Sequence, residues 1–287
     1  MIVSPLNKLV CPLCAKPLVA EPSRLVCGAG HSFDKSRNGH VNLLPVQNKR
    51  SLSPGDSKQM VQWRHAFLAG GYYDAIAEKI NDLVSKQLTT RSSLESYTVI
   101  DGGCGEGYYL TELATHLRRL SLATEVLLCG LDISKWAVQA AAKRDKSIQW
   151  IVASNKSIPV NRASTDLILC AFGFHCYDSF AGTLKSGGVL ILVDTYEDHL
   201  IEMRKLLYPT IKPFQPASND GAIEAGFSLS HSERLTVKRD LPSADIERLL
   251  GMTPHMHRAP KEGIEKVTSL EHLTLTIDVS FRVFVKD

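Results

Sequence analysis

Three cysteines and a histidine gather near the amino terminus, in the stretch CPLCAKPLVAEPSRLVCGAGH. They are Cys11, Cys14, Cys27 and His31, in the pattern C-x2-C-x12-C-x3-H. Thiolate and imidazole are ligands that Zn²⁺ prefers, and two cysteines separated by two residues can reach one ion from a single turn. Because four protein ligands leave no open coordination position, we predict a structural zinc site. His40 is an alternative fourth ligand with a less favourable spacing.

A second constellation is the stretch VIDGGCGEGYYL, in which a predicted buried strand ends at Asp101. The glycines of the following turn are Gly103, Gly105 and Gly107. Glycines allow a tight turn and a close approach of the backbone to a ligand. A glycine-rich turn alone does not separate nicotinamide, flavin and S-adenosyl-L-methionine sites. The tight G-x-G-x-G spacing differs from the dinucleotide pattern G-x-G-x-x-G and favours the methyl donor.

Polar residues at neighbouring strand ends support the methyl donor. Asp101 can meet the amino-acid part of S-adenosyl-L-methionine, and Asp132 at the end of the next strand can accept both ribose hydroxyls. Asp132 also suits a helix amino terminus beside Ser134, and the two roles are compatible. Ser154 and Asn155 follow the third strand, where polar groups would meet the adenine edge.

The elements that position these residues alternate between strands and helices from residue 97 onward. The pattern predicts strands at 97–101, 125–134, 148–154, 165–172 and 187–196, and helices at 107–120, 135–145 and 199–208. Two closing strands are expected at 226–241 and 272–287, with a helix at 242–252 between them. We therefore predict an α/β, Rossmann-like class I methyltransferase fold with a seven-stranded, mostly parallel sheet and an antiparallel closing strand.

The chain divides into three predicted regions. Residues 1–44 form a zinc-binding module of short strands and turns, and residues 45–58 form a linker. So small a module buries too little apolar surface to fold without its metal. Residues 59–287 form the methyltransferase domain, which begins with two lid helices joined at Gly70-Gly71.

Charge and composition limit the possible binding partners and the cellular compartment. The net charge is +3, yet residues 1–65 hold nine basic and three acidic residues, which leaves the remainder at −3. A basic front favours an anionic partner, although a solvated surface is an alternative. We find no apolar run near the ~18 residues that a membrane span needs and no secretory signal. We therefore expect a cytoplasmic protein, with cysteines outside the cluster as free thiols.

Nearly the whole chain resembles the bacterial large-subunit (23S) rRNA guanine-N1 methyltransferases. The resemblance rests on the zinc module followed by GHVNLLPVQNKR, PGDSKQM, RHAFLAGGYY, DGGCGEGYYL and GLDISKWAVQAAAKR, in this order. It implies a zinc module that grips an rRNA hairpin, joined to a methyltransferase domain, often as a homodimer. It also implies donor contacts at Tyr73, at the Gly105-Glu106 turn and at His199. A core or surface aromatic is the alternative for Tyr73, and a polar helix start is the alternative for His199.

The segment LILCAFGFHCYDSF after Asp166 departs from the Tyr-Ala-Pro-like run of that family. Its aromatic residues, Phe172, Phe174 and Tyr177, could stack on a flipped base, with core packing as the alternative. Asp166, His175 and His199 are candidates for the group that takes the proton of a guanine ring nitrogen. We hypothesise a guanine-N1 rRNA methyltransferase. The alternatives are a methyltransferase for small molecules or other RNA, and a non-catalytic protein that binds the donor together with RNA or protein.

Overall fold

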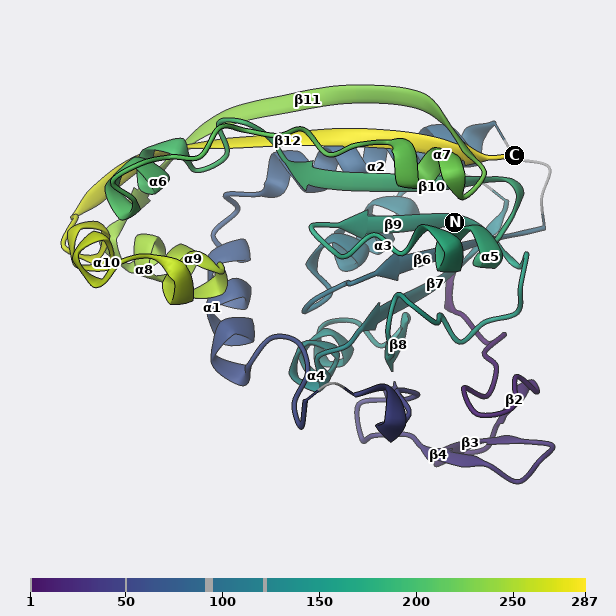
Figure 1. Cartoon of the computed structure of the whole chain (residues 1–287). Coiled ribbons are helices and arrows are strands. Elements are labelled where there is room, and N and C mark those ends of the chain that lie inside the picture. The colour runs from purple at the N-terminus through teal and green to yellow at the C-terminus, as the bar shows by residue number, and fades with distance from the viewer. Residues whose placement is uncertain (1, 50, 91–94, 121–122) are drawn as a thin grey trace.

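One twisted sheet organises the protein in a computed structural model that describes residues 2–49, 51–90, 95–120 and 123–287 (Figure 1). Its five central strands are parallel and lie in the spatial order β10-β9-β6-β7-β8. These strands are β6 Ser96–Gly102, β7 Glu125–Asp132, β8 Gln149–Val152, β9 Thr165–Ala171 and β10 Leu184–Thr195. All five were predicted from the apolar runs, and they are buried because helices cover both faces of the sheet.

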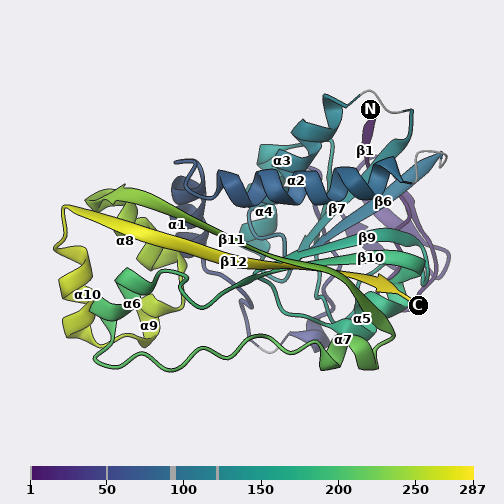
Figure 2. The same ribbon diagram turned by 90° about the horizontal axis from the view of Figure 1, so that it is seen from above.

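Successive residues of the central strands point to opposite faces and enter two separate cores. Val99 and Leu169 belong to one core, and Ile100 and Ile168 belong to the other. Helices cover the two faces (Figure 2). The first face carries α2 Asp74–Thr89, α3 Tyr108–Arg118 and α4 Lys135–Arg144, and the second carries α5 Tyr177–Thr183 and α7 Asp220–Glu224. In the described part of the chain, none of the helices has the length and apolar character to cross a membrane.

Two long strands close the sheet, β11 Phe227–Pro242 and β12 His272–Lys286. Strand β12 is antiparallel to both β10 and β11, so the predicted antiparallel closing strand is confirmed. The sequence predicted one helix between them, but the structure has α8 Ser243–Met252, α9 His255–Arg258 and α10 Lys261–Thr268. Pro254 and Pro260 precede α9 and α10. Proline lacks the N–H that would continue a preceding helix, which explains the breaks.

Two helices stand with α8 beyond the carboxyl ends of the central strands, α1 Lys58–Leu68 and α6 Ile201–Leu207 (Figure 1). Helix α1 packs on α8 at Gly251, where a Cβ would lie only 2.4 Å from the Trp63 ring. Gly71 adopts a φ of 76° in the turn that separates α1 from α2. The two predicted helices with a glycine hinge are therefore present, and they reach the edge where ligands of such sheets bind.

The amino-terminal region contributes to both sheets of the molecule. A small antiparallel sheet consists of β2 Leu18–Ala20, β3 Arg24–Cys27 and β4 Ser32–Asp34. The flanking strands β1 Val3–Pro5 and β5 Val41–Asn42 join β7 and β8, and a short helical turn, η1 Val46–Asn48, follows. The large sheet therefore has nine strands instead of the predicted seven. Because β8 covers only the last part of β7, β1 can pair with the part of β7 before it.

Candidate functional site

The four predicted metal ligands converge in the amino-terminal module. The ligand atoms of Cys11, Cys14, Cys27 and His31 all lie within 4.8 Å of one another. Ala15 returns the chain after Cys14 with a φ of 57° and donates its N–H to the Cys11 carbonyl at 2.8 Å. The Cys27 N–H in turn donates to the His31 carbonyl at 3.0 Å. Two local turns therefore build the cluster.

The distances between the ligand atoms fit zinc. The sulfurs of Cys11 and Cys27 lie 3.4 Å and 3.5 Å from His31 Nδ1. The sulfur of Cys14 lies 3.6 Å from that of Cys27. Ligands at the corners of a tetrahedron with ordinary Zn–S and Zn–N bond lengths would be separated by about 3.4–3.8 Å. The donor set and its spacing therefore match a four-coordinate structural zinc.

The surroundings favour a thiolate at Cys27 and leave His40 outside the cluster. Burial acts to raise the pKa of Cys27, but hydrogen bonds from the backbone of Ala29 and His31 lower it to about 6. The thiolate is the form that binds metal. His40 Nδ1 instead lies 2.7 Å from the hydroxyl of Ser36.

The glycine turn, residues 102–107, is packed at one end and open in its middle. Gly103, Gly105 and Gly107 all have positive φ, at 85°, 55° and 83°. A Cβ on Gly107 would lie 2.6 Å from the Trp150 ring, so α3 could not begin here with a larger residue. Around a Cβ on Gly105, the one heavy atom found within 4 Å in the described chain is Arg64 Nη1, at 3.8 Å. Gly105 is therefore the position where a ligand could approach the backbone.

Asp101 is a buried carboxyl group at the end of β6, with 1% of its surface exposed. Neither of its carboxylate oxygens has a hydrogen-bond partner among the described residues. Burial, together with the nearby charge of Asp132, raises the pKa of Asp101 to about 8. A buried polar group without a partner costs stability. Asp101 therefore suits the ammonium group of an amino-acid ligand.

Asp132 is held beside the glycine turn at the end of β7. Its Oδ1 accepts the N–H of Ser134 at 2.7 Å, and its Oδ2 accepts the N–H of Gly105 at 3.0 Å. Burial raises the pKa of Asp132, and these two hydrogen bonds oppose the shift. Ser134 also caps α4, because its hydroxyl accepts the N–H of Ala137 at 3.3 Å. Asp132 therefore lies both at the amino terminus of α4 and beside the glycine turn, and its contact with a ribose stays a prediction.

Of the two polar residues after β8, Asn155 is the one that lies against the glycine turn. A Cβ on Gly102 would lie 2.8 Å from Asn155 Oδ1. Nδ2 of Asn155 donates to the Phe174 carbonyl at 3.0 Å, and its buried Oδ1 has no partner in the described chain. Ser154 instead accepts the N–H of Lys156 and closes its own turn.

Glu106 anchors the glycine turn to α4. Its side chain is buried, and Oε2 accepts a hydrogen bond from Arg144 Nη2 at 2.6 Å. The same oxygen lies 2.9 Å from His65 Nδ1 of α1. Glu106 was predicted to contact S-adenosyl-L-methionine. Its side chain instead joins the glycine turn to α1 and α4.

Tyr73 and His199, predicted separately from distant stretches, meet in the structure. The Tyr73 hydroxyl lies 3.3 Å from His199 Nε2, and both side chains are buried. Since the N–H of Asp278 donates to Nδ1 at 3.2 Å, Nε2 carries the proton and donates to the Tyr73 oxygen. Burial lowers the pKa of His199 to about 4, so its ring is neutral at physiological pH. The ring of Phe172 lies 6.2 Å from Tyr73 and 6.4 Å from His199.

Asp166, a predicted proton acceptor, lies at the other end of the sheet. It is the second residue of β9, five residues or about 16 Å before the carboxyl end of that strand. Its Oδ2 accepts the N–H of Thr98 at 2.9 Å, and its Oδ1 lies 2.7 Å from Lys185 Nζ. Asp166 therefore stabilises the fold, and we do not retain it as a proton acceptor.

His175 lies at the carboxyl edge, in the segment that joins β9 to α5. Its Nε2 lies 3.1 Å from Asp194 Oδ1, and its Nδ1 lies 3.2 Å from the Tyr177 hydroxyl. Burial favours the neutral form of Asp194, but His175 and Arg282 lower its pKa below the ordinary value. Arg282 Nη2 lies 2.7 Å from Asp194 Oδ2. An ionised carboxylate therefore lies beside the imidazole of His175.

Sequence reasoning missed one cation at the site. Arg64 of α1 forms an ion pair with Asp56, and its Nη2 donates to the Met252 carbonyl of α8 at 3.2 Å. The Asp56 carbonyl accepts the hydroxyl proton of Ser134 at 2.7 Å, which docks the predicted linker on the end of β7. The available signal was a basic residue two turns before the Gly70-Gly71 hinge, which does not by itself predict these contacts.

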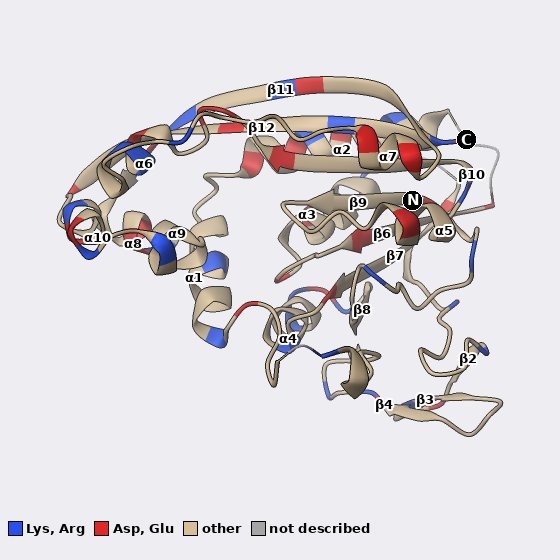
Figure 3. Ribbon diagram, in the orientation of Figure 1, with Lys and Arg blue, Asp and Glu red and all other residues tan. Residues whose placement is uncertain are grey.

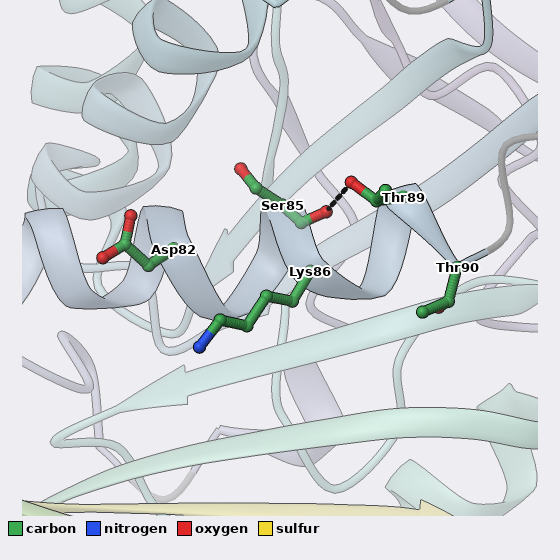
Figure 4. A pocket seen from close by; sticks show the side chains of 5 residues that line it. All are labelled: Asp82, Ser85, Lys86, Thr89 and Thr90. Carbon is green, nitrogen blue, oxygen red and sulfur yellow. Dashed lines mark hydrogen bonds between the residues drawn. The ribbon is translucent and has the colours of Figure 1, made fainter.

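A groove along α2 is lined by a single helix and its cap, whereas several elements meet at the carboxyl edge of the sheet (Figure 4). Its lining comes from α2 and the residue that caps it: Asp82, Ser85, Lys86, Thr89 and Thr90. Thr89 Oγ1 donates to the Ser85 carbonyl of the same helix. We therefore place the functional site at the carboxyl edge of the sheet and not here.

Models of known protein families match two separate parts of the chain. A zinc-ribbon model described as "RlmA, N-terminal" matches residues 9–52. A model described as "Methyltransferase domain" matches residues 99–187. The first match contains the whole metal cluster, and the second contains the glycine turn, Asp132 and His175.

Curated relatives match the chain from end to end. The "Putative 23S rRNA (guanine-N(1)-)-methyltransferase YxjB" of Bacillus subtilis (strain 168) is 32% identical over 96% of this chain and 96% of its own length. This chain belongs to the 23S rRNA guanine-N1 methyltransferase family. The "23S rRNA (guanine(748)-N(1))-methyltransferase" of Streptomyces fradiae, another relative, is 28% identical over 96% of this chain and 95% of its own length.

Solved structures are more distant from this family member. The YcgJ protein of Bacillus subtilis has a TM-score of 0.45 and 16% identity, over 70% of this chain and 98% of its own. A methyltransferase from Bacillus halodurans has a TM-score of 0.43 and 16% identity, over 70% of this chain and 97% of its own.

The residues of this family member fit both predicted cofactors. S-adenosyl-L-methionine is the cofactor of its methyltransferase domain, and structural zinc is the metal of its ribbon. The orphaned oxygens of Asp101 and the open approach at Gly105 suit the donor. The ligand-atom distances around Cys27 suit the metal.

Proposed function

We propose that this protein transfers a methyl group from S-adenosyl-L-methionine to N1 of a guanine in a hairpin of large-subunit rRNA. One chain combines a four-ligand metal cluster with a glycine turn beside Asp101 and Asp132. This combination carries the proposal, because relatives named for that reaction match 96% of the chain.

The side chains at the carboxyl edge have distinct tasks in this proposal. Bound S-adenosyl-L-methionine supplies an electrophilic methyl group. Asp101 pairs with the ammonium group of the donor, and Asp132 accepts hydrogen bonds from its ribose. Tyr73 and His199, locked to each other, form a rigid wall beside the site. Positioning of this kind is the main source of rate enhancement for an already reactive donor.

The turn after β9 offers stacking surface for the acceptor base. Phe174 is 89% exposed and Phe172 is 39% exposed, which is unusual for phenylalanine. Gly173 packs 3.5 Å from the Cβ position of Gly103, so this turn directly adjoins the glycine turn. A flipped guanine that stacks on Phe174 would therefore lie close to the donor edge.

His175 is the proton acceptor in our proposal. In this proposal Nε2 of His175 faces Asp194 Oδ1, and Nδ1 becomes free when Tyr177 turns aside. Nδ1 would take the proton from guanine N1 as N1 bonds to the methyl carbon, while the bond from that carbon to the donor sulfur breaks and S-adenosylhomocysteine leaves. Asp194 then stabilises the imidazolium, and the proton passes to solvent. His199 is unsuited to this task, because Asp278 occupies its Nδ1 and burial keeps its pKa low.

The amino-terminal module would grip the RNA. Residues 1–65 hold nine basic and three acidic residues, a net charge of +6, whereas the remaining 222 residues sum to −3; Figure 3 colours the charged residues of both parts. Lysine and arginine contacts to phosphates supply affinity more than sequence choice. The zinc fixes the shape of this basic surface.

Labelled methyl transfer to total rRNA from a strain lacking the gene tests the proposal, with mass mapping of the labelled nucleotide. We expect one N1-methylated guanine in large-subunit rRNA. Label that appears only in small molecules would refute the rRNA substrate. Calorimetry that detects no binding of S-adenosyl-L-methionine would refute any methyltransferase.

The boundaries at residues 44 and 58, a homodimer and a cytoplasmic location stay predictions. Sedimentation of the full chain, alone and with rRNA, checks the homodimer.

A further inference from the structure

A guanidinium group lies over the open part of the glycine turn. Arg64 Nη1 is 3.8 Å from the Cβ position of Gly105, where the backbone is most accessible to a ligand. The charge of Arg64 also acts on Asp132, Tyr73 and Tyr109, against the rise that burial causes in their pKa values. Arg64 is therefore electrostatically close to these three side chains.

The guanidinium is held in place by two distant segments. Nη1 pairs with Asp56 of the predicted linker, and Nη2 donates to the Met252 carbonyl at the end of α8. The side chain is 25% exposed, so it is sheltered from water but not sealed. A guanidinium has five N–H donors, and the contacts found in the described chain engage Nη1 and Nη2. Further N–H groups of the guanidinium therefore remain to bind an anion.

The charges around the glycine turn favour one orientation of an amino-acid ligand. Asp101 attracts an ammonium group and repels a carboxylate. Arg144, another cation near the turn, is already paired with the buried Glu106. A carboxylate on the same carbon as the ammonium group therefore has Arg64 as its partner at the Gly105 side.

We propose that Arg64 binds the α-carboxylate of the methionine part of S-adenosyl-L-methionine. Asp56 and the Met252 carbonyl position the guanidinium for this contact. The inference rests on the proposed function and assigns to the first lid helix a direct part in choosing the donor. Arginine suits the task because its planar fork can make two parallel hydrogen bonds to a carboxylate.

Two ligands that differ only in the carboxylate test the proposal: S-adenosyl-L-methionine and its decarboxylated form. Calorimetry with the full chain measures the affinity of each for the native protein, Arg64→Gln and Arg64→Lys. We expect Arg64→Gln to weaken binding of S-adenosyl-L-methionine about 10- to 100-fold, as for loss of a charged hydrogen bond, and to leave the decarboxylated ligand within about threefold. Arg64→Lys should fall between, because it keeps the charge but not the fork.

Arg248→Gln is the matched control, since Arg248 pairs with Asp245 on α8 and has no contact with the glycine turn in the described chain. We expect it to bind both ligands as the native protein does. If Arg64→Gln still prefers the carboxylate form as strongly as the native protein, the proposal is wrong. Equal weakening of both ligands also refutes it, because Arg64 would then only support the fold. A native protein that binds neither ligand refutes the proposed function instead.

Discussion

The metal cluster and the donor site are built in opposite ways. All four metal ligands come from residues 11–31, and two backbone turns bring them together. The donor site draws on α1, the ends of β6 and β7, the turn after β8 and the turn before α6. A short stretch of chain can therefore encode the metal cluster, whereas the donor site exists only when the sheet is in register.

This difference implies that the two sites can be damaged separately. Loss of a metal ligand should weaken RNA binding and leave binding of S-adenosyl-L-methionine unchanged. A lost side chain at the donor edge should spare zinc. The predictions below test this separation, beginning with the largest expected effect.

Replacement of a zinc ligand should have the largest effect. In Cys14→Ser, we expect bound zinc to fall well below one per chain, and methyl transfer to rRNA to fall at least about 100-fold, because the module loses its folding energy. Donor affinity should stay within about threefold. Metal analysis, rRNA methylation and calorimetry measure the three quantities. A parallel loss of donor affinity in Cys14→Ser would contradict the separation.

Replacement of His175 should slow the chemical step alone. We expect His175→Gln to lower the single-turnover rate about 100-fold, the usual size for loss of a general base, without a change in donor affinity. The deficit should shrink at alkaline pH, where guanine N1 loses its proton without help. His231→Gln is the control, because His231 also pairs with a carboxylate, that of Glu233, but on the distant β11. An unchanged pH dependence in His175→Gln would exclude the base role.

Replacement of Asp101 should change both affinity and proton release. The pKa of about 8 leaves Asp101 mostly protonated at pH 7, and an ammonium partner favours its ionised form. Donor binding at pH 7 should therefore release close to one proton in the native protein and none in Asp101→Asn. We expect the variant to bind the donor about tenfold more weakly. Calorimetry in two buffers of different ionisation enthalpy measures the proton, and equal release in both proteins would rule out Asp101 as its source.

The same pKa shift predicts how stability depends on pH. Asp101 has a higher pKa in the folded protein than its ordinary value, so the folded state holds the proton more tightly. The contribution is fully present below about pH 4 and is lost as pH rises through about 8. Asp101→Asn should remove this part of the decline, which urea unfolding at several pH values would reveal.

Replacement of Asp166 should have the smallest effect. Asp166→Asn keeps an acceptor for the N–H of Thr98 but loses the ion pair with the half-exposed Lys185. We expect a loss of about 1 kcal/mol in the free energy of unfolding, since exposure of the lysine weakens the pair. Methyl transfer should be unchanged. A large loss of activity without a loss of stability would show that Asp166 takes part in the reaction.

Features that depend on local spacing could be predicted from the sequence. The positions of Cys11, Cys14, Cys27 and His31 follow from two turns, and the alternation of apolar runs defines the central strands. The glycine turn with Asp101 and Asp132 follows from the rule that ligands bind at the carboxyl ends of parallel strands.

The folded structure, in contrast, shows which distant residues meet. It excluded Asp166, because a carboxylate at the amino end of β9 is far from the site, although its residue type suits a proton acceptor. It joined Tyr73 to His199 and brought Arg64 over Gly105, through contacts between elements far apart in the chain. It also added β1 and β5 to the sheet, because the backbone N–H and C=O groups along the edges of β7 and β8 can pair with an extended segment beside them. Periodicity identifies a strand or a helix, but the register of packed elements sets the distance between their side chains.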